Sequence, residues 1–404
     1  AYWQNGKCHL FASTQSSAFS HPFAARYVGV KPQDLVYVTE FCGGGFGSKG
    51  AAYPYMAIPA HMSKKISRPC LLRVSRAEEF YIGSARSSFQ GYAKIGFKEN
   101  GRISAADLYV VTANGPNTGF PDFRNYGNSA SIVYQPENMR WRGIPVMTNT
   151  PPCGPQRGPG ENQTATALEP LIDKAARQLG IDRLAIRKIN APDGNGKYGG
   201  KRLPLTSAYM KEALDKGAKL FNWEQKKKLS GLKNGSKVTG IGIGQAYHSA
   251  GSNGFDGLVR ITPNGKLHIH SGVGNLGTYS YASTSRVAAE VLNYDWDRCI
   301  IHRGDSSKGL PWVLGQFGSN TSFTTTRAVF AAADDARKKL YKIATMDLGG
   351  NIGDYELKEH KVVSKSDPAK SITYEQAAER AIELGGKFAG KQVDKDLHPL
   401  TKGA

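Results

Sequence analysis

The stretch EFCGGGFGSKG (residues 40–50) is a glycine-rich loop with one lysine, and it ends the strand-like run LVYVTEF (35–41). Glycine lets a backbone approach a ligand closely, and backbone N–H groups in such turns favour an anion. Its second half formally fits the G-x-G-x-x-G fingerprint of dinucleotide-binding folds. The context does not fit, because Pro54 and Pro59 lie where the crossover helix should run and the acidic residue expected about 20 positions onward is absent. A nucleotide-dependent oxidoreductase therefore stays a minor alternative.

Three further polar loops each precede a predicted helix. They are CGPQRGPGENQ (153–163), SGVGNLGTYS (271–280) and GQFGSNTSFTTTR (315–327). Arg157 adds a planar fork of donors to the first, and helix N-termini bind anions through their free N–H groups. For any single Ser or Thr in these loops, capping of the helix is the simpler interpretation. Four such loops in one chain together indicate an extended, anionic ligand with many hydrogen bonds.

The remaining pattern mixes strands and helices without a regular alternation. A strand is predicted at 7–14, and hairpins are predicted at 91–112 and 257–272, with turns at Asn100-Gly101 and Pro263-Asn264-Gly265. Apolar periodicity predicts helices at 164–180, 206–221, 280–293 and 323–345. This mixture predicts an α+β fold. The polar, turn-rich residues 196–236 predict a linker between domains 1–195 and 237–404.

The chain of 404 residues carries a formal charge of +20 and five cysteines. The lysines are dispersed and no nucleic-acid motif accompanies them, so a solvated basic surface or a face that docks to another subunit is favoured over nucleic-acid binding. No segment approaches 18 consecutive apolar residues, which predicts that no helix spans a membrane. An odd number of cysteines without CxxC spacing favours a reducing compartment, hence a cytoplasmic location; export to the periplasm with a partner is also compatible.

Taken in order, these motifs resemble the molybdopterin-binding large subunit of the xanthine oxidase and aldehyde oxidase family of molybdenum hydroxylases. STQ (13–15) followed by GGGFGSK (43–49) matches one pair of family motifs, and GPQRGPGENQ (154–163) matches the family's arginine loop. SGVGNLGTYS and FGSNTS (317–322) lie where that family has loops lining the cofactor. The resemblance covers nearly the whole chain, but only the central portion of that subunit. It implies two molybdopterin-binding domains of mixed sheets with packed helices.

The resemblance also implies roles for individual residues. Gln15 would donate a hydrogen bond to an oxo group on molybdenum, and Arg157 would stabilise negative charge on the substrate side. The other residues that would contact the cofactor are Gly45, Phe46, Gly47, Gly277, Thr278, Gly318 and Ser319. No side chain would bind the metal directly, because the pterin dithiolene holds it. The implied reaction hydroxylates an aldehyde, an N-heteroaromatic ring or another aromatic substrate, with water as the oxygen source.

Several positions depart from the family pattern. Thr278 replaces a glutamine, Asn275 replaces a glutamate, and Gly50 stands where xanthine-specific members carry a substrate-binding glutamate. The family's general-base glutamate has no counterpart in this chain, so the resemblance assigns the base to another chain. The implied cofactor is molybdenum-molybdopterin in its cytosine dinucleotide form. The implied partners are an iron–sulfur subunit, a chain supplying the rest of the molybdenum subunit, a flavin subunit carrying FAD, and a small-molecule substrate. The non-enzymatic alternative is a cofactor-free scaffold or binding subunit.

Overall fold

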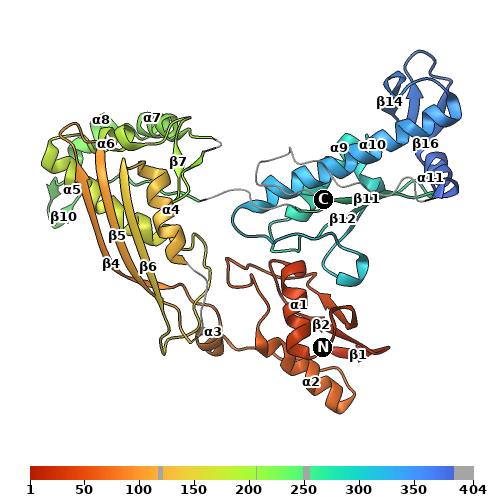
Figure 1. Cartoon of the computed structure of the whole chain (residues 1–404), viewed down its shortest axis with the longest axis horizontal. Helices are drawn as coiled ribbons and strands as arrows, with labels where there is room; N and C mark the ends of the chain where they lie inside the picture. Colours follow the sequence, from red (N-terminus) through yellow and green to blue (C-terminus); the bar gives the residue numbers. More distant parts are fainter. Residues whose placement is uncertain (117–121, 206, 249–254, 386–404) are drawn as a thin grey trace. The chain divides into compact units, whose positions relative to one another are not determined.

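The computed structural model describes residues 1–116, 122–205, 207–248 and 255–385. These residues form two compact units: unit 1 combines residues 1–74 with the part of the chain from 249 onward, and unit 2 comprises residues 75–248 (Figure 1). Each unit packs helices against small mixed sheets, so the predicted α+β fold is confirmed. The units divide the chain in space, whereas the boundaries predicted at 195 and 236 divide it along the sequence, and those boundaries stay a prediction.

Unit 2 is built on a three-stranded sheet in the order β4-β5-β6. The long antiparallel pair β4–β5 confirms the hairpin predicted at 91–112, with Gly101 in the left-handed conformation at φ 82°. The crossover between the parallel strands β5 and β6 contains helix α4. The buried face of the sheet packs against α4, α5 and α6 through Leu108, Val110, Ile172 and Ile186. The bounds are β4 Ser88–Phe97, β5 Ile103–Ala113, β6 Asn138–Val146, α3 Arg76–Ile82, α4 Asp122–Tyr134, α5 Glu161–Leu179 and α6 Arg183–Asn190.

The rest of unit 2 is a run of short elements after α6. Residues 206–221 were predicted to be helical, and α7 occupies most of that range. Trp223 is buried and donates its indole N–H to Asp182 at 3.2 Å, which fastens this run to the start of α6. The bounds are β7 Lys197–Tyr198, β8 Leu203–Pro204, α7 Met210–Phe221, α8 Trp223–Lys226, η3 Lys227–Leu229, β9 Lys233–Asn234 and β10 Lys237–Val238.

The N-terminal part of unit 1 is a sheet in the order β1-β2-β3, with β2 and β3 parallel. Helices α1 and α2 pack against it. The prolines that argued against a helix after the glycine loop do not prevent one: η2 begins at Pro54, and Pro59 is the third residue of α2, where its missing N–H has no partner within the helix to lose. The bounds are β1 Tyr2–Gln4, β2 Lys7–Phe11, α1 Ser17–Val28, η1 Pro32–Asp34, β3 Leu35–Val38, η2 Pro54–Met56 and α2 Ala57–Ile66.

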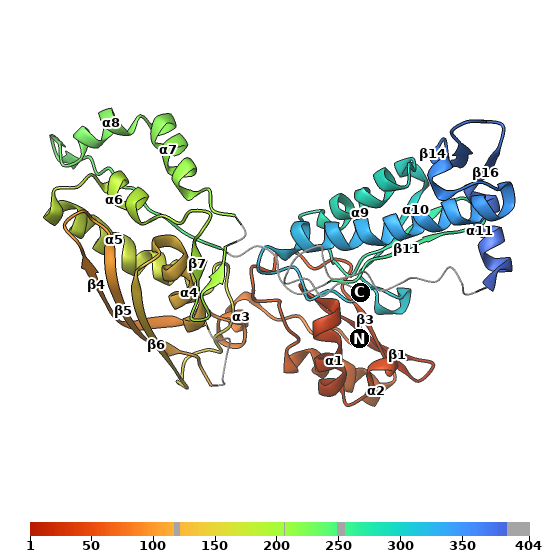
Figure 2. The ribbon, with the colours of Figure 1, turned by 45° about the horizontal axis from the view of Figure 1, so that its top comes forward.

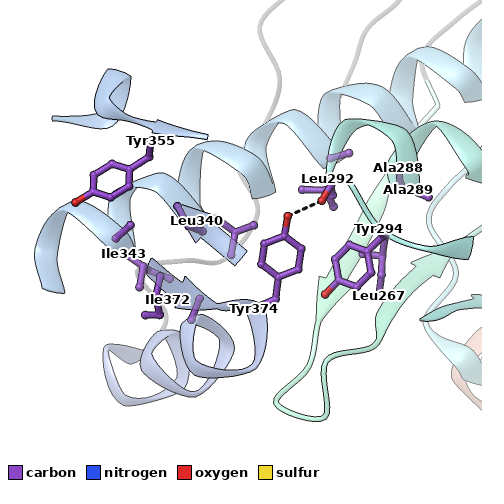
Figure 3. Close-up of a cluster of buried hydrophobic side chains, with 14 of the residues drawn as sticks. Leu267, Ala288, Ala289, Leu292, Tyr294, Leu340, Ile343, Tyr355, Ile372 and Tyr374 are labelled. Atoms are coloured by element: carbon purple, nitrogen blue, oxygen red, sulfur yellow. Dashed lines mark hydrogen bonds between the residues drawn. The ribbon is translucent and has the colours of Figure 1, made fainter. Parts of the chain in front are cut away.

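The second part of unit 1 packs two long helices on the sheet β11-β12-β13 and joins them to a smaller sheet, β14-β15-β16 (Figure 2). The predicted hairpin 257–272 and the predicted helices 280–293 and 323–345 are confirmed. Tyr374 is fully buried in the core and donates its hydroxyl to the backbone oxygen of Leu292 at 2.6 Å (Figure 3). The bounds are β11 Leu258–Ile261, β12 Leu267–His270, α9 Ser280–Val291, η4 Trp296–Arg298, β13 Cys299–His302, η5 Ser306–Lys308, η6 Thr321–Thr325, α10 Thr326–Leu348, η7 Ile352–Asp354, β14 Tyr355–Lys358, β15 Lys361–Ser364, β16 Ser371–Thr373 and α11 Tyr374–Glu383.

Candidate functional site

Gln15 joins two loops of unit 1 that are far apart in the sequence. The residue is buried between β2 and α1, and its amide oxygen accepts hydrogen bonds from the backbone N–H groups of Gly47 at 2.9 Å and Lys49 at 3.2 Å. Its amide nitrogen donates to the backbone oxygen of Gln316 at 2.8 Å. Backbone bonds from Gln15 N to Lys49 O (2.7 Å) and from Gln316 N to Gln15 O (2.8 Å) reinforce the junction. One side chain therefore holds the loops at 40–50 and 315–327 together.

A second glutamine, Gln316, brings in the third loop. Its side chain is buried, and its amide nitrogen donates to Gly274 O at 3.3 Å and to Ser280 Oγ at 2.8 Å. The backbone N–H of Cys42 donates to Asn275 O at 3.1 Å, which links the first loop to the third directly. Three of the four predicted ligand loops thus meet within unit 1. Gln15 was among the predicted contacts, whereas Gln316 was not.

The predicted cofactor residues of unit 1 lie on these joined loops in unusual backbone conformations. Phe46 and Ser319 are exposed and have φ values of 52° and 51°, a left-handed region that residues other than glycine rarely adopt. Gly277 and Gly318 lie in the same region, and a Cβ atom added at Gly277 would meet no heavy atom within 4 Å. Such conformations concentrate at ligand sites, where the surrounding structure maintains them. The N–H of Gly47 is already bonded to Gln15, whereas Thr278 is exposed and contacts Ser280 through its hydroxyl at 3.1 Å.

Buried polar atoms without partners lie on the same segment. Within the described ranges of the chain, no hydrogen bond reaches Gln316 Oε1, Asn320 Oδ1, Thr324 Oγ1 or Thr325 Oγ1. A buried polar group left unpaired costs about 1–3 kcal/mol, so proteins normally satisfy such groups with water or a ligand. Two amide oxygens and two hydroxyls in one run of ten residues are a suitable set for a polar, heterocyclic, phosphate-bearing group.

The contact between Gly45 and Gln15 is close enough to exclude any side chain at position 45. A Cβ atom there would lie 2.5 Å from both Cγ and Oε1 of Gln15. We expect Gly45→Ala to displace the buried amide and to lower the free energy of unfolding of the chain by about 1–3 kcal/mol. Urea denaturation measures this change. Gly353→Ala is the matched control, because a Cβ atom at Gly353 meets nothing within 4 Å. Equal stability of the two variants would contradict the described junction.

The arginine loop lies in unit 2 and leads into α5. Gly160 caps the helix with φ 80°, and the Arg157 backbone oxygen accepts from Arg86 Nη2 at 2.7 Å and from Asn162 Nδ2 at 3.1 Å. The guanidinium of Arg157 is exposed and makes no hydrogen bond or ion pair to residues that the structure describes. Arg86 was not predicted, because it comes from a segment about 70 residues earlier that carries no motif. The backbone of the loop is thus held by Arg86 and Asn162, and the Arg157 guanidinium has N–H donors without acceptors among the described residues.

Three titratable side chains pack near this loop. Asp122 begins α4 and is 1% exposed, and neither of its carboxylate oxygens has a hydrogen-bond partner among the residues that the structure describes. Glu161 begins α5, is also buried, and is hydrogen-bonded to Nδ1 of His248. Burial raises the pKa of Asp122 to about 6, and the hydrogen bond to Glu161 raises the pKa of His248. Sequence analysis missed this cluster, because isolated acidic residues at helix starts are also ordinary capping positions.

Because the pKa of Asp122 is raised, we expect the free energy of unfolding to depend on pH. A carboxyl has a pKa of about 3.9 in the unfolded chain, so its folded-state preference for the proton stabilises the fold below about pH 4 and is lost as pH rises through about 6. We expect Asp122→Asn to raise the free energy of unfolding above pH 6, by at most about 3 kcal/mol, and to change little at pH 4. Urea denaturation across this pH range measures the difference. Asp193→Asn, at an exposed turn, should leave the profile unchanged; a parallel shift in both variants would exclude burial of Asp122 as the cause.

Known proteins identify the family of this chain and share its fold. Two family models described as molybdopterin cofactor-binding domains match residues 1–191 and 216–398. The aldehyde oxidoreductase molybdenum-binding subunit PaoC of Escherichia coli O157:H7 is 25% identical over 418 aligned residues, covering 99% of this chain and 55% of that protein. The putative xanthine dehydrogenase molybdenum-binding subunit XdhA of Escherichia coli K12 is 27% identical, covering 89% of this chain and 49% of that protein. The chain thus spans about half the length of these relatives.

Solved structures share the fold at lower identity. Quinoline 2-oxidoreductase from Pseudomonas putida 86 has a TM-score of 0.75 at 21% identity, covering 93% of this chain and 50% of that chain. Aldehyde oxidoreductase from Desulfovibrio gigas has a TM-score of 0.75 at 21% identity, covering 84% of this chain and 38% of that chain. The family resemblance stated from the loops is confirmed. In the described ranges, no helix has the length and apolar character needed to cross a membrane.

Proposed function

Because this chain belongs to the molybdopterin cofactor-binding domain family and is similar to molybdenum-binding subunits of an aldehyde oxidoreductase and a xanthine dehydrogenase, we propose that it carries most of the cofactor pocket of a molybdenum hydroxylase. The observation that carries this proposal is the junction of three loops around Gln15 and Gln316, with unpaired buried polar atoms beside it. The available polar groups suit a molybdopterin. Exposed glycine backbone allows the ligand to approach closely, and buried amide oxygens and hydroxyls lack partners among the described residues.

Different residues of unit 1 would contact different parts of the cofactor. Gln316 Oε1 and Asn320 Oδ1, which lack partners in the described structure, would accept from N–H groups of the pterin, and the hydroxyls of Thr324 and Thr325 would donate to its oxygens. One of the two amide hydrogens of Gln15 has no acceptor among the described residues, and it would donate to the bound cofactor. Gly45, Phe46 and Gly47 would form the wall nearest the metal, and Gly277, Thr278, Gly318 and Ser319 would contact the pterin. When bound, the cofactor supplies the redox chemistry by which oxygen from water reaches the substrate.

Arg157 would act on the substrate. Its guanidinium is uncommitted, and its backbone is held by Arg86, so it can present two parallel N–H donors to negative charge that develops on the substrate. The names of relatives favour an aldehyde or an N-heteroaromatic ring as the substrate. No glutamate of residues 1–404 matches the family's general base, and we propose that the base comes from outside these residues.

The proposed assembly follows from the family. We propose the cytosine dinucleotide form of molybdenum-molybdopterin, an iron–sulfur subunit and a flavin subunit with FAD as electron-transfer partners, and a chain that completes the molybdenum subunit. We propose a cytoplasmic location, with periplasmic export on a partner as the other arrangement to be tested.

The test is molybdenum and pterin analysis of the natively purified protein, together with identification of its co-purifying chains. We expect about one molybdenum per chain, the stoichiometry of a single pocket. Gln15→Ala should lower that content severalfold, while Gln90→Ala, at an exposed position of β4, should not. A wild-type chain that purifies alone, folded and free of molybdenum and pterin, would refute the proposal and leave the cofactor-free scaffold as the function.

A further inference from the structure

We infer that residues 215–240 form a docking surface for an anionic phospholipid bilayer, and this inference does not depend on the proposed function. Helices α7 and α8 lie beyond α6 on the side away from strands β4–β6 (Figures 1 and 2). Across these 26 residues, the side chain of Trp223 is the one that is buried, and nearly all others are exposed. We call its six exposed lysines the lysine surface: Lys216, Lys219, Lys226, Lys228, Lys233 and Lys237.

The positive charge of this surface is not neutralised by the fold. The range contains two acidic residues, and both are already paired: Asp215 with Lys188 at 2.5 Å and Glu224 with Lys227 at 2.7 Å. None of the six lysines forms an ion pair with any residue in the described parts of the chain. Six uncompensated charges in 26 residues attract an anionic surface at a distance of several ångströms.

Apolar side chains project among these lysines. Leu220 is 89% exposed, Val238 is 59% exposed and Leu232 is 55% exposed, and Phe221 lies beside the Lys226 ammonium at 4.5 Å from its ring centroid. Exposed leucines on a soluble surface expose apolar area to water, whereas at a bilayer the same side chains enter the boundary between headgroups and acyl chains. Lysines around them would meet the headgroup phosphates.

The lysine surface is attached to the rest of unit 2 by contacts around Trp223. Trp223 donates to both oxygens of Asp182 at 3.2 Å, and Lys227 contacts the same carboxylate at 3.1 Å. The Arg183 guanidinium lies 5.5 Å from the Trp223 ring centroid. Residues 215–240 are therefore attached to unit 2. Trp223 packs at the start of α6, and the six lysines are exposed.

The residue types favour a lipid surface over a protein partner. Protein interfaces are depleted in lysine, and their energetic hot spots are enriched in tryptophan, tyrosine and arginine while leucine and valine are under-represented. Residues 215–240 contain no arginine and no tyrosine, and their one tryptophan is buried. Lysines mixed with exposed leucines are instead the composition of segments that bind anionic membranes peripherally.

The test is flotation of the 404-residue chain with phosphatidylcholine vesicles that contain or lack phosphatidylglycerol. We expect binding to the anionic vesicles alone, weakened by salt. Changing Lys219, Lys226, Lys228 and Lys233 to Gln should lower the partition coefficient by roughly 600-fold, because each lysine near a charged bilayer contributes about fivefold. The control variant changes four exposed lysines of unit 1 to Gln and has the same net charge: Lys7, Lys31, Lys65 and Lys370.

A second variant tests insertion. Leu220→Gln with Leu232→Gln should reduce the binding that survives at high salt while leaving the salt-sensitive part. Circular dichroism confirms that each variant is folded. Absence of wild-type binding to anionic vesicles, or an equal loss in the unit 1 control variant, would overturn the proposal. Selective, lysine-dependent capture of a co-purifying acidic subunit without vesicle binding would overturn it too, in favour of a protein partner.

Discussion

Replacing Arg187 by alanine is expected to lower the free energy of unfolding by about 3–5 kcal/mol, the usual cost of leaving buried charges without their partner. Arg187 lies on α6 and is completely buried. Its Nε and Nη2 donate to Glu169 Oε2 at 3.0 and 2.7 Å, and its Nη1 lies 2.8 Å from Asp173 Oδ1. The alanine variant would open a cavity beside both carboxylates of α5, leaving Glu169 with its hydrogen bond from Tyr134 and Asp173 with Arg183 at 3.6 Å.

Urea denaturation of the wild type and the variant measures this effect. Arg76→Ala is the matched control, because Arg76 also pairs with a glutamate but its side chain is 83% exposed. Surface pairs of that kind contribute at most about 1 kcal/mol. Arg187→Lys should recover part of the loss, since one ammonium cannot replace both bonds to Glu169 Oε2 and the contact with Asp173. If Arg187→Ala were no more destabilising than Arg76→Ala, the buried network would not hold α5 and α6 together as described.

Replacing Arg157 by alanine in the molybdenum-loaded assembly is expected to lower kcat/KM by about 10²–10³-fold, the typical effect of losing one preorganised donor to developing negative charge. The side chain is exposed and its guanidinium has no hydrogen bond or ion pair to residues that the structure describes, so its loss should leave the fold and the molybdenum content unchanged. Steady-state kinetics and metal analysis on the same preparation separate the two effects.

Arg177→Ala provides the control for this experiment, because Arg177 is another exposed arginine, on α5. Arg157→Lys should fall between the wild type and the alanine variant, since it keeps the charge and loses the planar fork. A variant that loses molybdenum together with activity would show that Arg157 holds the cofactor rather than the substrate. Unchanged kcat/KM in Arg157→Ala would remove the residue from the proposed active site.

The sequence allowed the loops and most elements to be predicted, because their signals are local. Glycine, asparagine and hydroxyl residues before an amphipathic run indicate a loop and a helix start within a single short window. The same reasoning failed at Pro59, where the position of the proline within the helix decides its effect and the first turn tolerates it. Element boundaries therefore depend on one or two residues whose context the pattern does not show.

The junction of the loops could not be predicted in the same way. Gln15 and Gln316 are 301 positions apart, and no periodicity relates them. Asp122, Glu161 and His248 come from three separate segments and meet because of the packing in unit 2. The resemblance to a family supplied what spacing could not, namely which cofactor these loops are expected to bind. It did not identify Gln316 or Arg86, whose contributions are contacts to backbone oxygens and to other loops.

The separation between Gln15 and Gln316 has a consequence for synthesis on the ribosome. At about 5–20 residues per second, Gln316 emerges about 15–60 seconds after Gln15. Unit 2 is contiguous in sequence, so the contacts within it become available while Gln15 still lacks its contact with Gln316. The polar atoms of Gln316, Asn320 and the neighbouring threonines are made after unit 2 is complete. The junction of the loops is thus among the later parts of the molecule to assemble.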